Sequence, residues 1–313
     1  MKTLTRTETA AFFRSRNNFL LVTHRRPDGD TLGSAAVLCM GLRQLGLNAW
    51  VLRNSQVTPK YQHLLRGLTK EEIGQDDTLV SVDVASERML PENFGSREIT
   101  LRIDHHGTAD SFTEMELVDA GSASCGEVVC DVLEELGVQL DIPMANALYT
   151  AISTDTGCFR YANTTTNTFA VAAKCARAGA DVFAINQALF ETNTLGRLRL
   201  QGWLVEHALF LQSGSIAICA LPKQVEEDLQ LTEDDMENIS GFPRTIEGVK
   251  IAATVRQENE DTVKVSIRAV PGYDAGAICA KFGGGGHKGA AGCSIKLPMD
   301  EAVQALIAAL PVI

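Results

Sequence analysis

The first 190 residues alternate between strand patterns and helix patterns, and this alternation constrains the fold more than any other feature. Apolar runs rich in β-forming residues lie at 18–24, 49–52, 78–84 and 98–104. Segments with helical periodicity lie at 32–45, 59–66, 122–136, 143–154, 166–178 and 182–190. Strands that alternate with helices predict an α/β fold with a doubly wound, mostly parallel sheet. Ligands of such sheets bind beyond the carboxyl ends of the strands.

The second half of the chain has a different pattern and predicts a smaller, mixed α+β domain. A helical stretch at 194–206 leads into more closely spaced strand patterns. We expect strands at 208–212, 215–221, 249–257, 262–269 and 290–297, and helices at 223–239, 275–282 and 300–310. A length of 313 residues also exceeds what a single core usually supports. We therefore predict a first domain over 1–191, a helical linker over 192–207 and a second domain over 208–313.

The net charge of −11 argues against a long basic track for polymeric nucleic acid. A short anionic ligand is still compatible with this charge, because a local site can supply the positive groups. Seven of the acidic residues lie in one segment without a basic residue, at 226–228, 233–235 and 237. We expect that segment to be a solvated face.

Cysteine usage and the lack of long apolar runs predict a cytoplasmic protein. The eight cysteines are scattered among small and aliphatic residues without a Cys-x-x-Cys pair, so we expect buried thiols in a reducing compartment. No apolar run approaches the ~18 residues of a membrane helix. The N-terminal segment mixes charges throughout and has no apolar signal-peptide core.

Aspartate and histidine side chains collect where the predicted strands end. Consecutive parallel strands end at the same edge of a sheet, so we expect these side chains to converge. A mixed set of imidazoles and carboxylates suits Mn²⁺, Mg²⁺, Fe²⁺ or Zn²⁺. The number of ligands suits two cations, as in two-metal phosphoryl-transfer sites. The residues concerned are His24, Asp28, Asp30, Asp83, Asp104, His105, His106 and Asp155.

Four short motifs suggest other chemistries, and the surrounding sequence argues against each. Asp28-Gly-Asp30-Thr resembles a phosphatase motif, but three residues separate it from the preceding strand. Asp155-Thr-Gly matches the aspartic-protease signature, but it follows a helix and has no second copy. An EF-hand loop would need glutamate where Cys39 stands. The glycines of a Gly-x-Gly-x-x-Gly match at 284–289 follow a helix, whereas a dinucleotide-binding loop follows a strand.

A run of four glycines at 283–286, followed by His287, predicts a phosphate-binding segment in the second domain. Glycines leave the backbone N–H groups unobstructed, so that they can form an anion nest. A flexible connector is the alternative, but a connector would seldom lie between a helix and a strand within one domain. Arg268, at the end of a predicted strand, is a second candidate contact to a phosphate or a base.

In their order and spacing, these motifs resemble those of the DHH phosphoesterase superfamily. The segment FGGGGHKGAAG at 282–292 is similar to the signature of the DHHA1 substrate-binding domain that accompanies the DHH domain. The resemblance spans almost the whole chain, and the compact length is most similar to the nanoRNase and pAp-phosphatase group. The four matching motifs are His24-x3-Asp28-x-Asp30, Asp83 at a strand end, Asp104-His105-His106, and Asp155.

The resemblance implies a role for each metal-site residue. One cation would be held by His24, Asp28 and Asp83. The other would be held by Asp30, Asp83, His105 and Asp155, with Asp83 bridging the pair. Manganese is the first metal that we expect, with magnesium, iron and zinc as alternatives.

The resemblance also implies how the substrate is bound and cleaved. His106 would contact the scissile phosphate, and Asp104 would support the site from behind. The far end of the substrate would be bound by Arg268, Gly284, Gly285 and His287. The implied substrates are very short oligonucleotides, cleaved to mononucleotides, and 3′-phosphoadenosine 5′-phosphate (pAp), which is dephosphorylated to AMP.

Several alternatives stay open. Cyclic or linear dinucleotides and single-stranded DNA are alternative substrates, and a non-catalytic nucleotide sensor is an alternative of another class. Two departures from the family pattern bear on substrate choice rather than on the metals: Ala269-Val270 replace a serine and a lysine, and Gly29 and Thr31 differ in the first motif. We expect no membrane partner, and a homodimer stays open.

Overall fold

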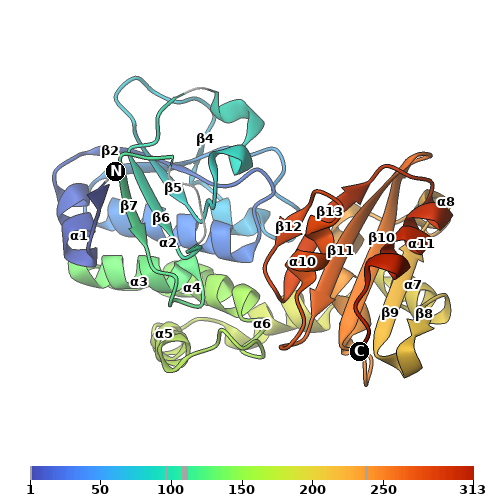
Figure 1. The fold of residues 1–313 in the computed structure, drawn as a ribbon. Helices are drawn as coiled ribbons and strands as arrows, with labels where there is room; N and C mark the ends of the chain where they lie inside the picture. Colours follow the sequence, from blue (N-terminus) through green and yellow to red (C-terminus); the bar gives the residue numbers. More distant parts are fainter. Residues whose placement is uncertain (1, 96, 108–111, 237–238) are drawn as a thin grey trace. The chain divides into compact units, whose positions relative to one another are not determined.

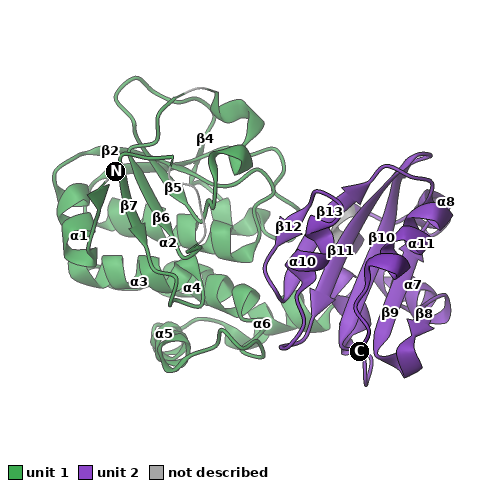
Figure 2. Ribbon diagram, viewed as in Figure 1, with its two compact units in different colours: residues 1–192 green, residues 193–313 purple. Residues whose placement is uncertain are grey.

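The computed structural model describes residues 2–95, 97–107, 112–236 and 239–313. The chain divides into two compact units, residues 1–192 and 193–313 (Figure 2). Each unit has its own sheet and its own hydrophobic core.

A parallel sheet forms the centre of the first unit (Figure 1). Its strands are β1 (Lys2–Thr3), β2 (Asn18–Val22), β3 (Asn48–Leu52), β4 (Thr69–Lys70), β5 (Thr78–Val82), β6 (Leu101–Asp104) and β7 (Met115–Val118). Their order is β1-β7-β6-β5-β2-β3-β4, and every neighbouring pair is parallel. The predicted α/β class is confirmed.

Alternate residues of each strand pack into two different clusters, because successive side chains of a strand point to opposite faces. Leu21 belongs to the large cluster that includes α1 to α4, whereas Leu20 belongs to a smaller cluster with Phe94 and Ile99. In the view of Figure 1, α3 and α4 lie below the sheet. The helices of this unit are α1 (Arg6–Arg14), α2 (Gly29–Gln44), α3 (Cys125–Leu136), α4 (Ile142–Asp155), α5 (Thr166–Arg177) and α6 (Val182–Asn186).

Some elements of the first unit differ from the expectation. The strands β1, β4 and β7 were not expected, because they have two to four residues and form through pairing with distant strands. The helix expected at 59–66 is only a short 3-10 helix at Gln62–Leu65. The helix expected at 182–190 ends at Asn186 and continues as a π-helical turn at Gln187–Glu191.

The second unit contains a mixed sheet, as expected. Its order is β12-β13-β11-β10-β9-β8, with β9 and β10 parallel and the other pairs antiparallel. The strands are β8 (Leu209–Leu211), β9 (Ile216–Leu221), β10 (Ile251–Asn259), β11 (Thr262–Ala269), β12 (Gly285–Gly286) and β13 (Ala290–Ile295). The helices are α7 (Leu195–Glu206), α8 (Lys223–Asp228), α9 (Glu233–Met236), α10 (Ala275–Ala280) and α11 (Met299–Ala309).

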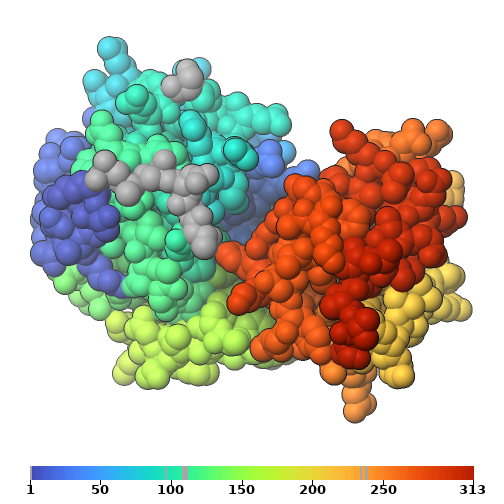
Figure 3. Space-filling model, in the orientation of Figure 1, coloured from blue at the N-terminus to red at the C-terminus, as the bar shows by residue number. Residues whose placement is uncertain are grey.

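Helices pack on both faces of this mixed sheet. α10 and α11 contribute to the main cluster on one face, and Leu200 and Leu204 of α7 pack with Cys219 and Leu221 in a separate cluster. The predicted linker therefore coincides largely with α7, which packs within the second unit. On the face shown in Figure 3, the red C-terminal segment with α11 lies beside the orange strands.

The acidic segment at 223–239 is not the single solvated helix that we expected. It is divided into α8 and α9, and Asp235 is buried, where it accepts hydrogen bonds from Thr232 and Thr194. Glu226 forms a two-pronged ion pair with Arg256, at 2.6 and 2.7 Å. Two of these partners, Thr194 and Arg256, are 41 and 30 residues away in the sequence, so charge counting alone could not find them. Glu237 lies outside the described residues.

Seven of the eight cysteines are buried, and Cys158 is half-buried, which corrects the expectation for that residue. Within the described part of the chain, no helix has the length and apolar character that a membrane crossing requires.

The contact between α2 and α4 requires a glycine. A methyl group on Gly33 would lie 2.4 Å from the carbonyl oxygen of Ala147. Although alanine favours a helix more than glycine does, we expect Gly33→Ala to destabilise the first unit by about 1–3 kcal/mol. Native-state hydrogen exchange of the α2 amides measures this loss.

The matched control for this substitution is Gly202→Ala in α7. No atom lies within 4 Å of the position that its methyl group would take. We expect this control to be neutral or to stabilise α7 by up to about 1 kcal/mol. Unchanged exchange of α2 in Gly33→Ala would contradict the close helix packing.

Candidate metal centre

Three neighbouring strands bring the predicted site residues to one edge of the first sheet. His24 lies two residues beyond β2, Asp83 directly follows β5, and Asp104 is the last residue of β6. β5 pairs in parallel with both β2 and β6, so the three strands end at the same edge. The last residue of α4, Asp155, joins them there.

All eight predicted residues belong to groups whose ligand atoms lie within 4.8 Å of one another. One group contains His24, Asp28 and Asp83, and another contains Asp30, His105 and Asp155. The third contains Asp83, Asp104, His105 and His106. Asp83 therefore belongs to two groups, as does His105, and the cluster is continuous.

Asp83 is held in a strained and incompletely bonded state. Its φ of +59° lies in the left-handed region, which is uncommon for a residue other than glycine. Its Oδ2 accepts a 2.7 Å hydrogen bond from the Thr31 hydroxyl. Its Oδ1 is buried and has no hydrogen-bond partner among the described residues. Because an unsatisfied buried oxygen is costly, this atom fits a bound cation.

Asp30 is fixed by the N-terminus of α3. Its two oxygens accept hydrogen bonds from the backbone N–H groups of Cys125, at 2.7 Å, and Gly126, at 3.0 Å. The Ser34 hydroxyl donates a third, at 2.9 Å. The positive end of a helix stabilises a carboxylate. Even so, burial, together with the negative charge of Asp83, raises the pKa of Asp30 well above its ordinary range.

His105 directs Nε2 at the cluster, because its other ring nitrogen is held by the backbone. Its Nδ1 lies 3.2 Å from the carbonyl oxygen of Ser122, which can only accept, so Nδ1 carries the hydrogen. Its Nε2 lies 3.4 Å from Asp155 Oδ2 and 3.7 Å from Asp83 Oδ1. This arrangement, with the far nitrogen bonded to a carbonyl, is typical of a metal-binding histidine.

Asp104 links a buried arginine to His106. Its Oδ2 accepts hydrogen bonds from Arg102, at 2.6 and 3.0 Å. Its Oδ1 accepts from His106 Nδ1, at 2.8 Å, and from the N–H groups of His105 and His106. Both oxygens are thus occupied, so Asp104 orients its neighbours, although it lies within reach of the other ligand atoms.

The same contacts set the charges of this pair. Burial would raise the pKa of Asp104, but the hydrogen bond and charge of His106, with the charge of Arg102, lower it to about 2. The hydrogen bond to Asp104 is the main cause that raises the pKa of His106 to about 9. His106 is therefore a cation at neutral pH, with Nδ1 directed at Asp104.

The remaining carboxylates make the cluster electrostatically unfavourable by itself. Burial, and then the charge of Asp28, raises the pKa of Asp83. Burial raises the pKa of Asp155 to about 7, although nearby His105 acts in the opposite direction. Divalent cations would neutralise these groups, and the mixture of imidazole and carboxylate donors suits Mn²⁺, Mg²⁺, Fe²⁺ or Zn²⁺.

Sequence reasoning missed several residues that position the ligands. Arg102 is 1% exposed, and besides Asp104 it lies 3.7 Å from Glu116. A charged residue inside an apolar strand, two positions before an aspartate, was the available signal, since residues i and i+2 share a face. Thr31 and Ser34 had no such signal, because polar residues in the first turns of a helix are ordinary.

The predicted substrate residues of the second unit lie around β12. A methyl group on Gly284 would lie 2.3 Å from the carbonyl oxygen of Gly292, whereas Gly285 faces open space. His287 is exposed and begins the turn into β13. Arg268 lies on β11, opposite Ala290 of β13, and its Nη1 donates to the Ile267 carbonyl.

The anion nest expected at the glycines is only partly available. The N–H groups of Gly283, Gly284 and His287 donate to carbonyl oxygens of the protein, at 2.8–3.1 Å. These three N–H groups therefore stabilise the turn around β12 and are not available to bind an anion. The sequence showed the lack of side chains but could not show which N–H groups have partners.

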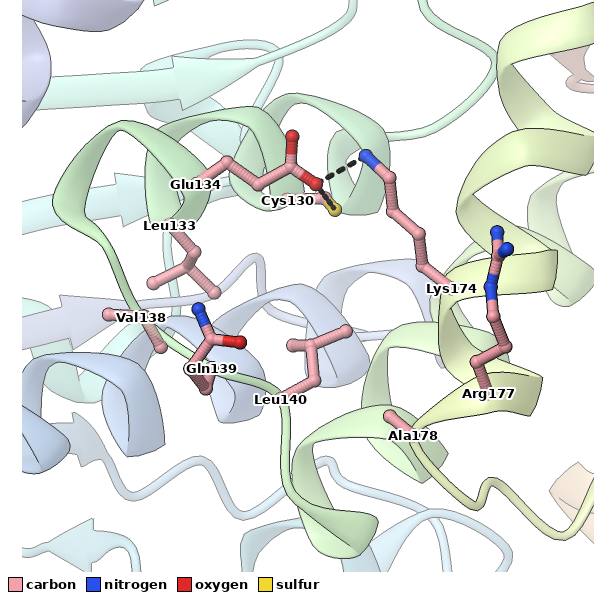
Figure 4. A pocket seen from close by; sticks show the side chains of 9 residues that line it. All are labelled: Cys130, Leu133, Glu134, Val138, Gln139, Leu140, Lys174, Arg177 and Ala178. Atoms are coloured by element: carbon pink, nitrogen blue, oxygen red, sulfur yellow. Dashed lines mark hydrogen bonds and ion pairs between the residues drawn. The ribbon is translucent and has the colours of Figure 1, made fainter.

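A cavity of about 510 Å³ lies elsewhere in the first unit (Figure 4). It lies between α3 and α5, and an ion pair between Lys174 and Glu134 crosses its rim. None of the eight metal-site residues lines it. Its lining residues are Cys130, Leu133, Glu134, Val138, Gln139, Leu140, Lys174, Arg177 and Ala178.

Without metal, we expect the first unit to become more stable as the pH falls from about 8 to about 5. The pKa of Asp155 is about 7 in the folded state, against an ordinary value of 3.8. The folded state therefore binds this proton more tightly, and its stability decreases as the pH rises through 7. His106, with a raised pKa of about 9, acts in the same direction at higher pH.

Urea unfolding in a chelator, at several pH values, measures this dependence. Added Mn²⁺ should stabilise the protein most at high pH, where the ligands are ionised. Asp155→Asn should flatten the metal-free profile. A metal-free stability that rises with pH over this range would contradict the assignment.

Arg102→Met should destabilise the protein by about 3–5 kcal/mol, because it removes a buried charge partner of Asp104 and both hydrogen bonds that Arg102 donates to its Oδ2. Urea unfolding measures the loss. Arg53→Met is the matched control: Arg53 pairs with Glu71 at an exposed site, so its loss should cost less than about 1 kcal/mol. Equal effects of the two substitutions would show that the buried pair has no special role.

Comparisons with known proteins agree with this fold. The model of the DHH family N-terminal domain matches residues 18–152, and that of the DHHA1 domain matches residues 214–311. A solved structure, an exopolyphosphatase-related protein from Bacteroides fragilis, has the same fold with a TM-score of 0.84 and 23% identity, covering 97% of this chain and 94% of that chain.

Two curated relatives carry the name bifunctional oligoribonuclease and PAP phosphatase NrnA. The one from Thermus thermophilus is 32% identical over 299 residues, which cover 93% of this chain and 88% of the relative. The one from Bacillus subtilis is 25% identical and covers 91% of each chain. With both family models matched and this identity over nearly its whole length, the chain belongs to the DHH phosphoesterase family and carries a DHHA1 domain.

Proposed function

We propose that this protein is a two-metal phosphoesterase that hydrolyses short oligonucleotides to mononucleotides and pAp to AMP. The observation that carries the proposal is the position of Asp83, a buried carboxylate that is shared by two ligand groups and has one oxygen without a hydrogen-bond partner among the described residues. One cation would be held by His24, Asp28 and Asp83. The other would be held by Asp30, Asp83, His105 and Asp155.

Bound divalent cations, with manganese as our first choice, would polarise the phosphoryl oxygens and lower the pKa of a water molecule. The protein's own residues supply the rest. His105 offers Nε2 in a fixed direction, because Ser122 holds its Nδ1. Thr31 lies within hydrogen-bond distance of both Asp28 and Asp83, so its hydroxyl sets the orientation of two ligands together.

His106 is the candidate general acid. Asp104 holds its Nδ1, so the half-exposed ring keeps Nε2 free for the substrate. With its pKa raised to about 9, the ring is protonated at neutral pH. It can therefore stabilise negative charge on the phosphate and give a proton to the leaving oxygen. Arg102 and Asp104 act through His106 by fixing its orientation.

The substrate class rests on the relatives and on the charge of the chain. The named activities of the two NrnA relatives are those of an oligoribonuclease and a PAP phosphatase. A net charge of −11 agrees with a short substrate rather than a polymer. We propose that Arg268, Gly284, Gly285 and His287 contact the substrate, with exposed Gly285 and His287 the most accessible of the four.

We expect the double substitution Asp104→Ala, His105→Ala to lower the rate of mononucleotide release at least about 100-fold, because it removes a metal ligand and the partner of His106. The assay follows cleavage of a diribonucleotide with Mn²⁺. His63→Ala, which alters an exposed histidine outside the cluster, is the matched control and should keep full activity. Intact activity of the double variant would refute the mechanism.

The same assay separates the alternatives. Release of AMP from pAp and of mononucleotides from di- and trinucleotides supports the proposal. Preference for a cyclic dinucleotide, or progressive degradation of single-stranded DNA, would change the proposed substrate and leave the proposed mechanism unchanged. Nucleotide binding by calorimetry without turnover would indicate a sensor.

A further inference from the structure

The segment after Asp155 forms a strained loop that the metal centre does not use. Gly157, Cys158 and Phe159 have φ values of +56°, +58° and +62°, so three consecutive residues adopt left-handed backbone. Two of them are not glycine. Such a conformation persists only where the surrounding structure fixes it, and it is concentrated at functional sites.

Several contacts fix this loop beside the metal centre. The side chain of Asn163 donates to the backbone carbonyls of Asp155 and Ala123, at 3.1 and 3.0 Å. The N–H of Tyr161 donates to the carbonyl of Thr156, at 3.0 Å, so the chain returns to the residue next to Asp155. The Phe159 ring stacks on Phe169, with ring centres 5.6 Å apart.

The loop presents Tyr161 with one face covered and the other open. A methyl group on Gly157 would lie 2.4–2.6 Å from three atoms of the Tyr161 ring, Cζ, Cε1 and Cε2. Nearly equal distances to these three atoms place that position over the ring face. The backbone of Gly157 therefore backs one face. Tyr161 is 53% exposed, so ring surface that Gly157 does not cover is accessible.

The backbone that holds Tyr161 adjoins the proposed reaction centre. Gly157, which backs the ring, is two residues from Asp155, so their Cα atoms are at most about 7.6 Å apart. Asp155 Oδ2 lies 3.4 Å from His105 Nε2 in the ligand cluster. In a nucleotide, only the ribose separates the base from its phosphate. A phosphate at the metal centre thus leaves its base within reach of this ring.

We propose that Tyr161 is a stacking platform for the nucleobase next to the scissile phosphate. An open aromatic face binds any base, because every base has a π-face, and such contacts strengthen binding without sequence preference. The inference rests on the proposed function and deepens it, since it assigns recognition of the base to the first unit. It also explains the glycine of the Asp155-Thr-Gly motif, where a side chain would displace the ring.

The test compares two substrates across four proteins, with the full chain and Mn²⁺. The substrates are a dinucleotide and its analogue that lacks the base beside the scissile phosphate. The proteins are the wild type, Tyr161→Phe, Tyr161→Leu and the control Phe183→Leu. Phe183 of α6 is an exposed aromatic residue, 71% exposed, that lies outside the proposed site.

We expect Tyr161→Leu to raise KM for the dinucleotide about tenfold, with a smaller change in kcat, and Tyr161→Phe to stay within about twofold of the wild type. The analogue should bind the wild type and Tyr161→Leu alike, because it has no base to stack. Phe183→Leu should match the wild type on both substrates. A rise in KM that is equal for both substrates, or no rise at all, would overturn the inference.

Calorimetry distinguishes this failure from a failure of the proposed function. AMP and ribose 5-phosphate are titrated into the wild type with Ca²⁺ in place of Mn²⁺. Tighter binding of AMP, lost in Tyr161→Leu, supports the platform. Equal binding of the two ligands overturns only the platform, whereas binding of neither refutes nucleotide recognition altogether.

Discussion

The repulsion among buried carboxylates at one edge of the parallel sheet is the constraint on which the rest of the site depends. Asp30 and Asp83 are both buried, and burial with neighbouring negative charge raises the pKa of each. The fold offsets part of this cost with the N-terminus of α3, which binds Asp30, and with Thr31, which binds Asp83. The Oδ1 of Asp83 has no hydrogen-bond partner among the described residues, and bound divalent cations would offset the remaining repulsion.

A second interaction extends from the interior to the surface of the site. Arg102 is among the largest fully buried side chains, and together with His106, the larger influence, it lowers the pKa of Asp104 at the end of β6. Asp104 in turn holds His106, which is 38% exposed. A buried cation thereby fixes the orientation and charge of an accessible imidazole. His105, one residue earlier, has a different partner, because its Nδ1 lies 3.2 Å from the carbonyl oxygen of Ser122.

Much of the architecture was predictable because it is encoded locally. Apolar runs that end in aspartate or histidine indicated both the strands and the ligands, and parallel pairing predicted their convergence. The elements that could not be predicted are those that form through distant contacts. β7 has four residues and pairs with β6, and Asp235 is buried with a hydrogen bond from Thr194, 41 residues away, in a segment that charge alone marked as solvated.

The sequence by itself determined which groups reach the site, because strand periodicity places His24, Asp83 and Asp104 at the strand ends whatever surrounds them. Tertiary structure decided the state of each group. Asp30 meets the N–H of Cys125, 95 residues away, and only the packing of α2 against α3 brings the two together. The same holds for Gly283 and Gly284, whose N–H groups donate to carbonyl oxygens within the turn before β12. Protonation, orientation and access depend on neighbours in space, and a linear pattern does not contain them.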